Sequence, residues 1–275
     1  MASDSLAGSL ETPVVDPTLG IDRLTGPTIP MPAMTHSHTS LETYEECPRQ
    51  HFLDHVVNAF SDYRDGSTAE STGVSQQAIG VLFHDTAEQA AEEATTDPDD
   101  WYRICERLAK QRRDRDALPA AKACIDRYFE LDISNWTIVD AEREFKFEVE
   151  GHDLVGYIDA VYRTPDDELV IIDYKATERK RDIETNQQLP LYLLACRDLY
   201  EEPVSRAGYA YVGEIGPKVS MRTFDDAELD AVRSAVTKSM DHITDTTFAR
   251  YEAGTHCQWC EHNQLPCADE SGMEY

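Results

Sequence analysis

Two aspartates and a lysine in the middle of the chain could hold a divalent cation and a water molecule. Asp159 lies in one apolar run, and Asp173 and Lys175 lie in the next. The segment 164–168, Thr-Pro-Asp-Asp-Glu, separates the two runs and is typical of a β-hairpin turn. With a loop at 165–167, Asp159 faces Asp173 on the adjacent strand, and their Cβ atoms are about 5 Å apart.

This pairing predicts a metal site, because like charges at such a distance destabilise a fold unless something compensates them. Carboxylate oxygens suit Mg²⁺ or Mn²⁺. Lys175 shares a strand face with Asp173, so its ammonium could orient a metal-bound water. The alternative is a solvated hairpin face with an ordinary Asp–Lys pair. Against it, the run 170–172 (Val-Ile-Ile) marks a buried strand, where charged side chains are rarely idle.

Two helix faces carry further candidates. Gly80 and His84 are four residues apart, so the missing side chain of Gly80 clears room on the face that His84 uses. His84 is therefore a candidate third metal ligand, with a core or surface histidine as the alternative. Gln188 and Tyr192 have the same spacing on a later helix. The alternative for this pair is a tyrosine in the core beside a solvated glutamine.

The C-terminal cysteines have the spacing of metal ligands. Cys257, Cys260 and Cys267 form the pattern C-x2-C-x6-C, which needs a fourth ligand. The total of seven cysteines is odd and the first residues show no secretory signal, so a disulfide framework is not expected. One candidate is a zinc site completed by His256 or His262. Burial in helices is expected for the cysteines at positions 105, 124 and 196.

The apolar pattern predicts helices first, and then strands and helices that interleave. A disordered tail is expected over 1–35, and a helix starts at Thr39, three residues before Glu42. Strands are predicted over 138–149, 153–163, 168–175, 206–213 and 217–223. Helices are predicted over 76–94 with a Ser75 cap, in one or two pieces over 101–132 after an acidic break at 97–100, and over 185–200 and 225–243. This order indicates an α/β fold with a mixed sheet flanked by helices. Glu142 and Glu144 share one strand face; contact of one of them with the site is the alternative to an exposed face, and the exposed face is favoured.

The composition constrains the environment more than the partner. The 275 residues include 53 acidic and 25 basic side chains, which gives a net charge of −28, and only 7 of the basic residues are lysines. Such a composition resembles that of halophilic archaeal proteins, in which salt screens dispersed carboxylates. The acidity therefore does not exclude a nucleic-acid substrate. No apolar run is long enough to span a bilayer, and we expect a cytoplasmic protein with no membrane partner.

Five motifs in order resemble those of a known family. The segments Gly156-Tyr157-Ile158-Asp159 and Ile172-Asp173-Tyr174-Lys175 are similar to the core of the PD-(D/E)XK nuclease superfamily. The G-x-x-D form resembles the RecB-like exonuclease branch, which includes the CRISPR-associated adaptation exonucleases. Three further segments resemble motifs of the same branch: G-x-x-x-H at 80–84, Q-x-x-x-Y at 188–192 and the opening helix at 39–48. The resemblance covers about residues 38–268.

The resemblance implies a restriction-endonuclease-like fold and a set of site residues. It implies one nuclease domain over 36–270, with a helical insertion at about 95–135 and a cysteine segment at 257–267. It implies metal binding by His84, Asp159, Asp173 and the carbonyl of Tyr174. In the catalytic site it places Lys175, Asp159, Asp173, Gln188 and Tyr192, the last two bracing the lysine or contacting substrate. It also supplies Cys47 as the fourth ligand of a 4Fe–4S cluster with Cys257, Cys260 and Cys267, which would join the two ends of the domain, with zinc as the alternative.

The expected activity is that of a Mg²⁺- or Mn²⁺-dependent DNA exonuclease acting on single strands or duplex ends, in repair and recombination or in CRISPR spacer acquisition. A helicase or a CRISPR integrase is the expected partner protein. One alternative is a non-catalytic DNA-binding or assembly subunit that keeps the fold and the cluster. Another is a zinc-clipped protein of unrelated function. The basic stretches at 103–115 and 179–181 could grip phosphates, or they could belong to helix faces of mixed charge.

Overall fold

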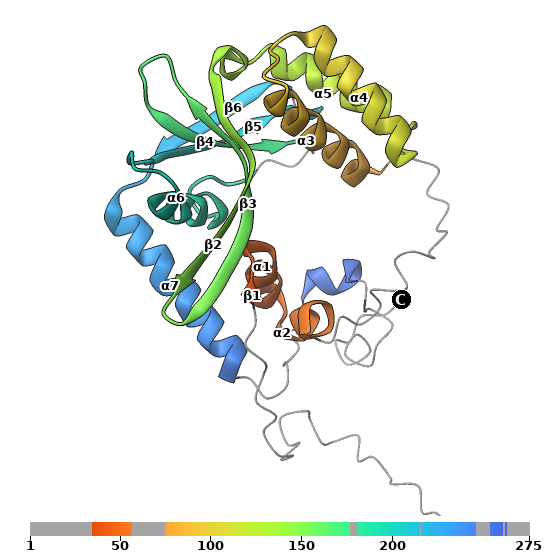
Figure 1. Ribbon diagram of the computed structural model, residues 1–275. Helices are drawn as coiled ribbons and strands as arrows, with labels where there is room; N and C mark the ends of the chain where they lie inside the picture. Colours follow the sequence, from red (N-terminus) through yellow and green to blue (C-terminus); the bar gives the residue numbers. More distant parts are fainter. Residues whose placement is uncertain are drawn as a thin grey trace, which may run out of the picture.

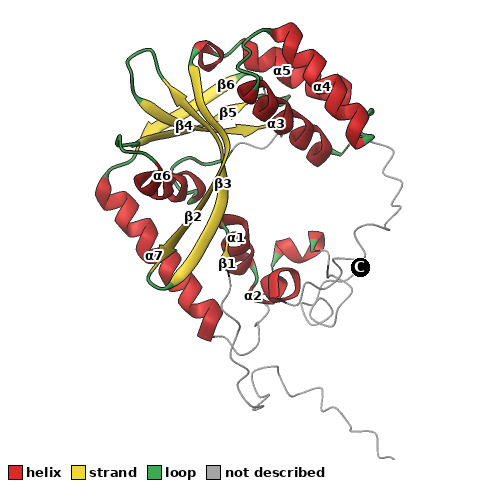
Figure 2. Ribbon diagram, viewed as in Figure 1, coloured by secondary structure: helices red, strands yellow, loops and turns green. Residues whose placement is uncertain are grey.

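A computed structural model describes residues 35–56, 75–176, 181–214, 216–245, 254–260 and 262. Its strands form one mixed sheet in the order β1-β3-β4-β5-β6, with β2 paired to β3 (Figures 1 and 2). The strands are β1 (Thr35–His36), β2 (Thr137–Val149), β3 (His152–Arg163), β4 (Leu169–Lys175), β5 (Arg206–Tyr211) and β6 (Lys218–Thr223). The disordered tail predicted over 1–35 lies outside the described residues except for Thr35, and so do 263–270 of the predicted domain.

Helices cover both faces of the sheet, as Figure 1 shows. The helices are α1 (His38–Glu46), α2 (Pro48–His51), α3 (Gln76–Glu92), α4 (Pro98–Arg112), α5 (Leu118–Phe129), α6 (Gln188–Leu199) and α7 (Asp226–Asp245). Helices α3, α4 and α5 share a buried core with one face, and α1, α6 and α7 share a second core with the other. The mixed α/β fold flanked by helices, predicted from the sequence, is confirmed.

The β3–β4 hairpin has the register that the turn chemistry predicts. Ala160 pairs with Ile172, and Arg163 pairs with Leu169, so the next positions along the two strands are Asp159 and Asp173. The loop closes with the Thr164 amide donating to the Glu168 carbonyl at 2.9 Å, which leaves the three residues 165–167 in the turn. One of them, Asp167, has a left-handed backbone (φ 66°), a conformation that aspartate tolerates better than most residues.

Strand β2 departs from the simple alternation predicted for 138–149. Its pairing with β3 shifts between Ile138 and Asp140, so one extra residue bulges at this point. Glu142 then adopts a left-handed backbone (φ 44°) between two regular pairs, opposite Asp159. Farther along the strand the prediction is right, since Phe145, Phe147 and Val149 are all buried. The irregular half of β2 is the half that approaches the candidate site.

Two helix starts differ from the prediction. Helix α1 is capped by Ser37, whose hydroxyl accepts from the Ser40 amide while the Ser40 hydroxyl accepts from the Ser37 amide; Thr39 is therefore inside the helix. The acidic segment 97–100 begins α4 instead of breaking the chain. Asp97 accepts from the Asp99 amide, and the proline after it has the backbone geometry of a first helical residue. The Ser75 cap of α3 is confirmed.

Gly156 of the G-x-x-D motif gives space to an aromatic ring. Phe145 lies opposite it on β2, and a Cβ atom added to Gly156 would lie 2.7 Å from Cζ of that ring. The ring is buried, and its centroid is 5.8 Å from that of Tyr192 on α6. A side chain at position 156 must therefore push Phe145 toward the residues that line the candidate site.

We expect Gly156→Ala to lower the free energy of unfolding by about 1–3 kcal/mol, because the added methyl overpacks a buried aromatic pair. Urea unfolding followed by far-UV circular dichroism measures the change. The double variant Gly156→Ala/Phe145→Leu removes the clash, so it is expected to lose less stability than the sum of its two single variants. Strict additivity of the two losses would contradict this explanation.

Candidate metal centre and lysine network

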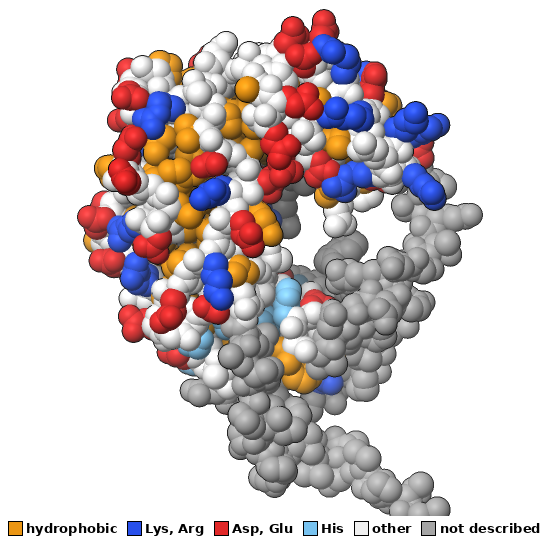
Figure 3. Space-filling model, viewed as in Figure 1, with side chains coloured by type: hydrophobic (Ala, Val, Ile, Leu, Met, Phe, Trp, Pro, Cys, Tyr) orange, Lys and Arg blue, Asp and Glu red, His pale blue; other side chains and the backbone are white. Residues whose placement is uncertain are grey.

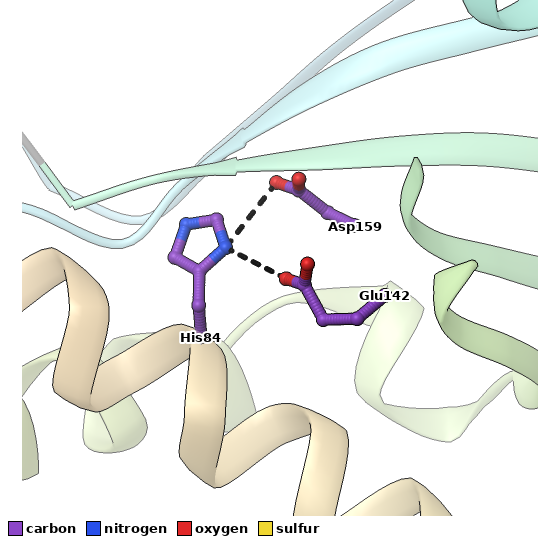
Figure 4. A group of neighbouring side chains, drawn as sticks. All are labelled: His84, Glu142 and Asp159. Carbon is purple, nitrogen blue, oxygen red and sulfur yellow. Dashed lines mark hydrogen bonds and ion pairs between the residues drawn. The ribbon is translucent and has the colours of Figure 1, made fainter. Parts of the chain in front are cut away.

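Three side chains from three elements converge in a group that could hold a metal ion. His84 extends from α3, Glu142 from the bulged half of β2 and Asp159 from β3 (Figure 4). Nδ1 of His84 lies 3.3 Å from Oε1 of Glu142 and 3.5 Å from Oδ2 of Asp159. One ligand atom from each residue lies within 4.8 Å of the other two. Among the described residues, no other group of three or more histidine, cysteine or acidic side chains has such spacing.

The backbone of Tyr174 fixes two of these side chains. Oδ2 of Asp159 accepts a hydrogen bond from the Tyr174 amide at 2.8 Å, just beyond the last β3–β4 pair. The carbonyl oxygen of Tyr174 lies 3.2 Å from Nε2 of His84. A histidine that donates from Nε2 presents Nδ1 to the carboxylates, which is the orientation seen in metal-binding histidines that are held by a backbone carbonyl. The carbonyl expected to bind metal therefore contacts His84.

Electrostatics favour a positive charge at the centre of the group. Burial lowers the pKa of His84, but the charge of Asp159 and the hydrogen bond with Glu142 raise that pKa to about 9. Burial and the neighbouring Asp173 raise the pKa of Asp159 to about 7. A proton on His84 thus balances the carboxylates at neutral pH. A divalent cation would supply the same balance, and it would compete with that proton.

Asp173 does not join this ligand group. Its carboxylate is buried, with 1% of the side chain exposed, and its Oδ2 lies 2.5 Å from Nζ of Lys175. The buried carboxylate of Asp173 is therefore held by an ion pair with Lys175. Asp173 nevertheless contributes to the raised pKa of both Asp159 and His84, so its charge reaches the centre.

Lys175 is held by a chain of polar groups on α6. Its Nζ lies 3.3 Å from Oε1 of Gln188, and Nε2 of Gln188 donates to the Tyr192 hydroxyl at 2.9 Å. The lysine also lies over the Tyr209 ring, 5.4 Å from the centroid. The structure therefore brings together Asp173, Lys175, Gln188 and Tyr192. The sequence spacing Q-x-x-x-Y acts here by placing both α6 side chains on the face that contacts the lysine.

The donor set fits a divalent cation. One imidazole and two carboxylates offer borderline and hard ligand atoms, which suit Mn²⁺ and, through the oxygens, Mg²⁺. The charge of Asp173, which is paired with Lys175, also acts on Asp159. Bound metal would lower the pKa of a coordinated water and neutralise charge on a phosphate. His84, Glu142 and Asp159 are the residues that would hold it.

Sequence reasoning favoured an exposed face for Glu142 and Glu144, left contact of one of them with the site as the alternative, and overstated the role of Gly80. In the structure Glu142 contacts His84, whereas Glu144 is exposed. The only signal was its register opposite Asp159, which a bulge in β2 made unpredictable. A Cβ atom added to Gly80 would meet Ala176 at 3.9 Å, an ordinary contact, so Gly80 does not need to be a glycine to make room for His84.

The basic stretch on α4 is largely neutralised. Figure 3 shows lysines and arginines over α4 interspersed with acidic side chains. Arg103 pairs with Asp100, Arg107 with Glu93 and Arg112 with Asp85. In the second stretch, Arg181 pairs with Glu42 at 3.0 Å, while residues 179 and 180 lie outside the described residues. These ion pairs favour the interpretation as helix faces of mixed charge.

The cysteines that would join the two ends are only partly described. Cys47 is buried at the start of α2, Cys257 and Cys260 lie in and after a 3₁₀ turn (Thr255–Trp259), and Cys267 lies outside the described residues. The C-terminal segment does reach the first helices, because Nε2 of His262 lies 2.7 Å from Oδ1 of Asp54. The helix cysteines at 105, 124 and 196 are buried, as predicted.

Comparison with known protein families assigns the chain to one of them. The sequence profile of the PD-(D/E)XK nuclease superfamily matches residues 35–265. The chain therefore belongs to the PD-(D/E)XK nuclease superfamily. No curated protein matches the chain. In the described part of the structure, no helix has the length and apolarity that crossing a membrane requires.

Two solved structures are similar over most of their length. The crystal structure of SSO0001 shares 14% identity, covers 85% of this chain and 86% of its own, and has a TM-score of 0.39. A candidate exonuclease from Eubacterium rectale shares 11% identity, covers 84% of this chain and 88% of its own, and has a TM-score of 0.49.

Removal of a ligand is expected to weaken metal binding. Glu142→Gln keeps the size of the side chain but removes its charge, and we expect the dissociation constant for Mn²⁺ to rise more than about tenfold. Isothermal titration of the metal-free protein with Mn²⁺ measures it. Glu144→Gln on the same strand is the matched control and is expected to bind Mn²⁺ like the unmodified protein. Equal effects of the two substitutions would exclude Glu142 as a ligand.

Proposed function

We propose that this protein is a metal-dependent DNA exonuclease. The observation that carries the proposal is the position of Lys175, which Asp173 and Gln188 hold within the same set of interacting charges as the group of His84, Glu142 and Asp159. Membership of a nuclease superfamily supports phosphodiester hydrolysis as the reaction. Mg²⁺ and Mn²⁺ are the proposed cofactors, since the donor atoms suit both.

The side chains can divide the chemistry between them. His84, Glu142 and Asp159 would hold a metal ion that, when bound, would lower the pKa of a water and neutralise charge on the scissile phosphate. The Lys175 ammonium can orient the attacking water and stabilise the additional negative charge on the pentavalent phosphorus. Gln188 positions this ammonium, and Tyr192 positions Gln188. The Tyr174 carbonyl holds the His84 ring in place, so that Nδ1 of the ring faces the two carboxylates.

The substrate and the pathway follow from the resemblance of the motifs. The G-x-x-D and Q-x-x-x-Y forms support assignment to the RecB-like branch, and hence single-stranded DNA or duplex ends as substrate. Repair and recombination or CRISPR spacer acquisition are the proposed processes, with a helicase or an integrase as partner in the cytoplasm. The halophile-like composition supports catalysis at high salt, where phosphate contacts contribute little through counterion release.

Loss of the lysine is expected to abolish most of the activity. With end-labelled single-stranded DNA, Mn²⁺ and molar salt, we expect Lys175→Ala to lower kcat by about 10²–10³-fold, because a group that stabilises the transition state is removed. Lys218→Ala, an exposed lysine on β6, is the matched control and is expected to keep full activity. Gel analysis of the labelled products measures both rates and shows whether nucleotides are released from an end.

Retained cleavage in Lys175→Ala would contradict the proposed role of the site. DNA binding by the unmodified protein, without cleavage in Mg²⁺ or Mn²⁺, would instead identify the non-catalytic DNA-binding subunit.

We further propose that Cys47, Cys257, Cys260 and Cys267 hold a 4Fe–4S cluster that ties the two ends of the domain together. The contact between Asp54 and His262 supports this, because it brings the C-terminal segment beside the helix turn that follows Cys47. Such a clip would close a loop of more than two hundred residues, so it would remove much entropy from the unfolded chain.

Purification without oxygen is expected to yield about four iron and four sulfide per chain. Cys47→Ser is expected to lose most of the iron and to lower the melting temperature. Cys124→Ser, a buried helix cysteine outside the proposed ligand set, keeps the iron. Metal analysis by mass spectrometry measures both contents, and one zinc without iron in the unmodified protein would replace the cluster by a zinc site.

A further inference from the structure

An open cleft of about 570 Å³ begins at the metal-ligand group and ends at an exposed aromatic ring. Its lining includes Val81, His84, Asp85, Glu88, Glu142 and Tyr157. Two of these, Val81 at 36% and Tyr157 at 54%, belong to the few large apolar side chains that the described residues expose. The Tyr157 ring is thus exposed to water in a cleft whose other lining side chains are mostly charged.

The position of Tyr157 follows from the strands that build the metal-ligand group. Tyr157 precedes Asp159 by two residues on β3, so both side chains lie on the same face of the sheet. On β2 it pairs with Glu144, which lies two residues after Glu142, the residue that faces Asp159. Helix α3 also lines the cleft. It contributes His84 of the metal-ligand group and Val81, which lies three residues earlier on the helix. The ring therefore lies two residue pairs along the strands from Glu142 and Asp159, on the same face.

The charge of the cleft selects which part of a nucleotide can enter it. Asp85, Glu88 and Glu142 line it, and their carboxylates repel phosphate. Of the basic residues, Arg112 is paired with Asp85. A nucleobase carries no charge, offers a flat π-face to an aromatic ring and has amino groups that carboxylates can accept from. The cleft is thus better suited to a base than to the sugar–phosphate backbone.

We propose that Tyr157 stacks on the nucleobase next to the scissile phosphate. This inference rests on the proposed function, since the phosphate must lie at the group of His84, Glu142 and Asp159. The neighbouring base then extends along the cleft, with Val81 as the apolar edge. Stacking of this kind tolerates every base and so confers a preference for unpaired strands without a sequence preference.

The kinetic test separates binding from chemistry. Stacking of a base on an aromatic side chain corresponds to about 5- to 100-fold in affinity. We expect Tyr157→Ala to raise KM for single-stranded DNA by that factor with kcat within about twofold, and Tyr157→Phe to restore KM. Val139→Ala, another exposed apolar side chain that does not line the cleft, is the matched control and keeps both constants.

A binding measurement keeps the inference falsifiable without catalysis. DNA with 2-aminopurine next to the 3′- or 5′-terminal phosphate is bound in Ca²⁺, and stacking on Tyr157 quenches its fluorescence. Tyr157→Ala is expected to lose this quenching, and Tyr157→Phe to keep it. Cleavage by the unmodified protein with unchanged KM and quenching in Tyr157→Ala would overturn the stacking role alone. Quenching that depends on Tyr157 without any cleavage would overturn the nuclease and leave the stacking role, and absence of DNA binding would overturn both.

Discussion

The rest of the site depends on two aspartates buried side by side at the end of one hairpin. Asp159 and Asp173 follow the last regular pair of β3 and β4, and burial with mutual repulsion raises the pKa of Asp159 to about 7. Two neighbours offset this repulsion from opposite sides. His84 contacts Asp159, and Lys175 contacts Asp173, so each carboxylate has its own cation. The two carboxylates therefore have different partners: the proton on His84 can be replaced by a metal ion, while Asp173 remains paired with Lys175.

The hairpin could be predicted from the sequence because a turn of three residues fixes its register, and register fixes which side chains meet. Spacing also placed Lys175 on the strand face of Asp173, whereas Gln188 and Tyr192 were placed beside it by the resemblance of their motif, and the structure brings the three together. Glu142 could not be found in this way. A bulge and a left-handed residue on β2 shift the pairing, and both are set by packing with β3 rather than by a local signal. The separation of Asp173 from the ligand group could not be predicted either, because the ion pair of Asp173 with Lys175 depends on side-chain rotamers.

The acidic composition and the paired arginines change how this protein could hold a polyanion. Most arginines of α4 are already bound to carboxylates, so phosphate contacts would have to compete with existing ion pairs. In high salt the gain from releasing counterions is small in any case. For the proposed DNA substrate, affinity at high salt would then depend on contacts that salt screens less, namely a metal ion at the phosphate and an aromatic surface at the base. Tyr157 is the exposed aromatic side chain in the position to supply the second contact.

Stability and catalysis are connected through one row of aromatic packing. Gly156 admits the ring of Phe145, this ring packs against Tyr192, and the Tyr192 hydroxyl accepts from the amide that holds Lys175. Gly156, three residues before Asp159, is therefore small because of a contact that continues to helix α6. Lys175 is thus linked to this packing through Gln188, whereas His84 and Asp159, two of the three candidate metal ligands, contact the backbone of Tyr174 instead.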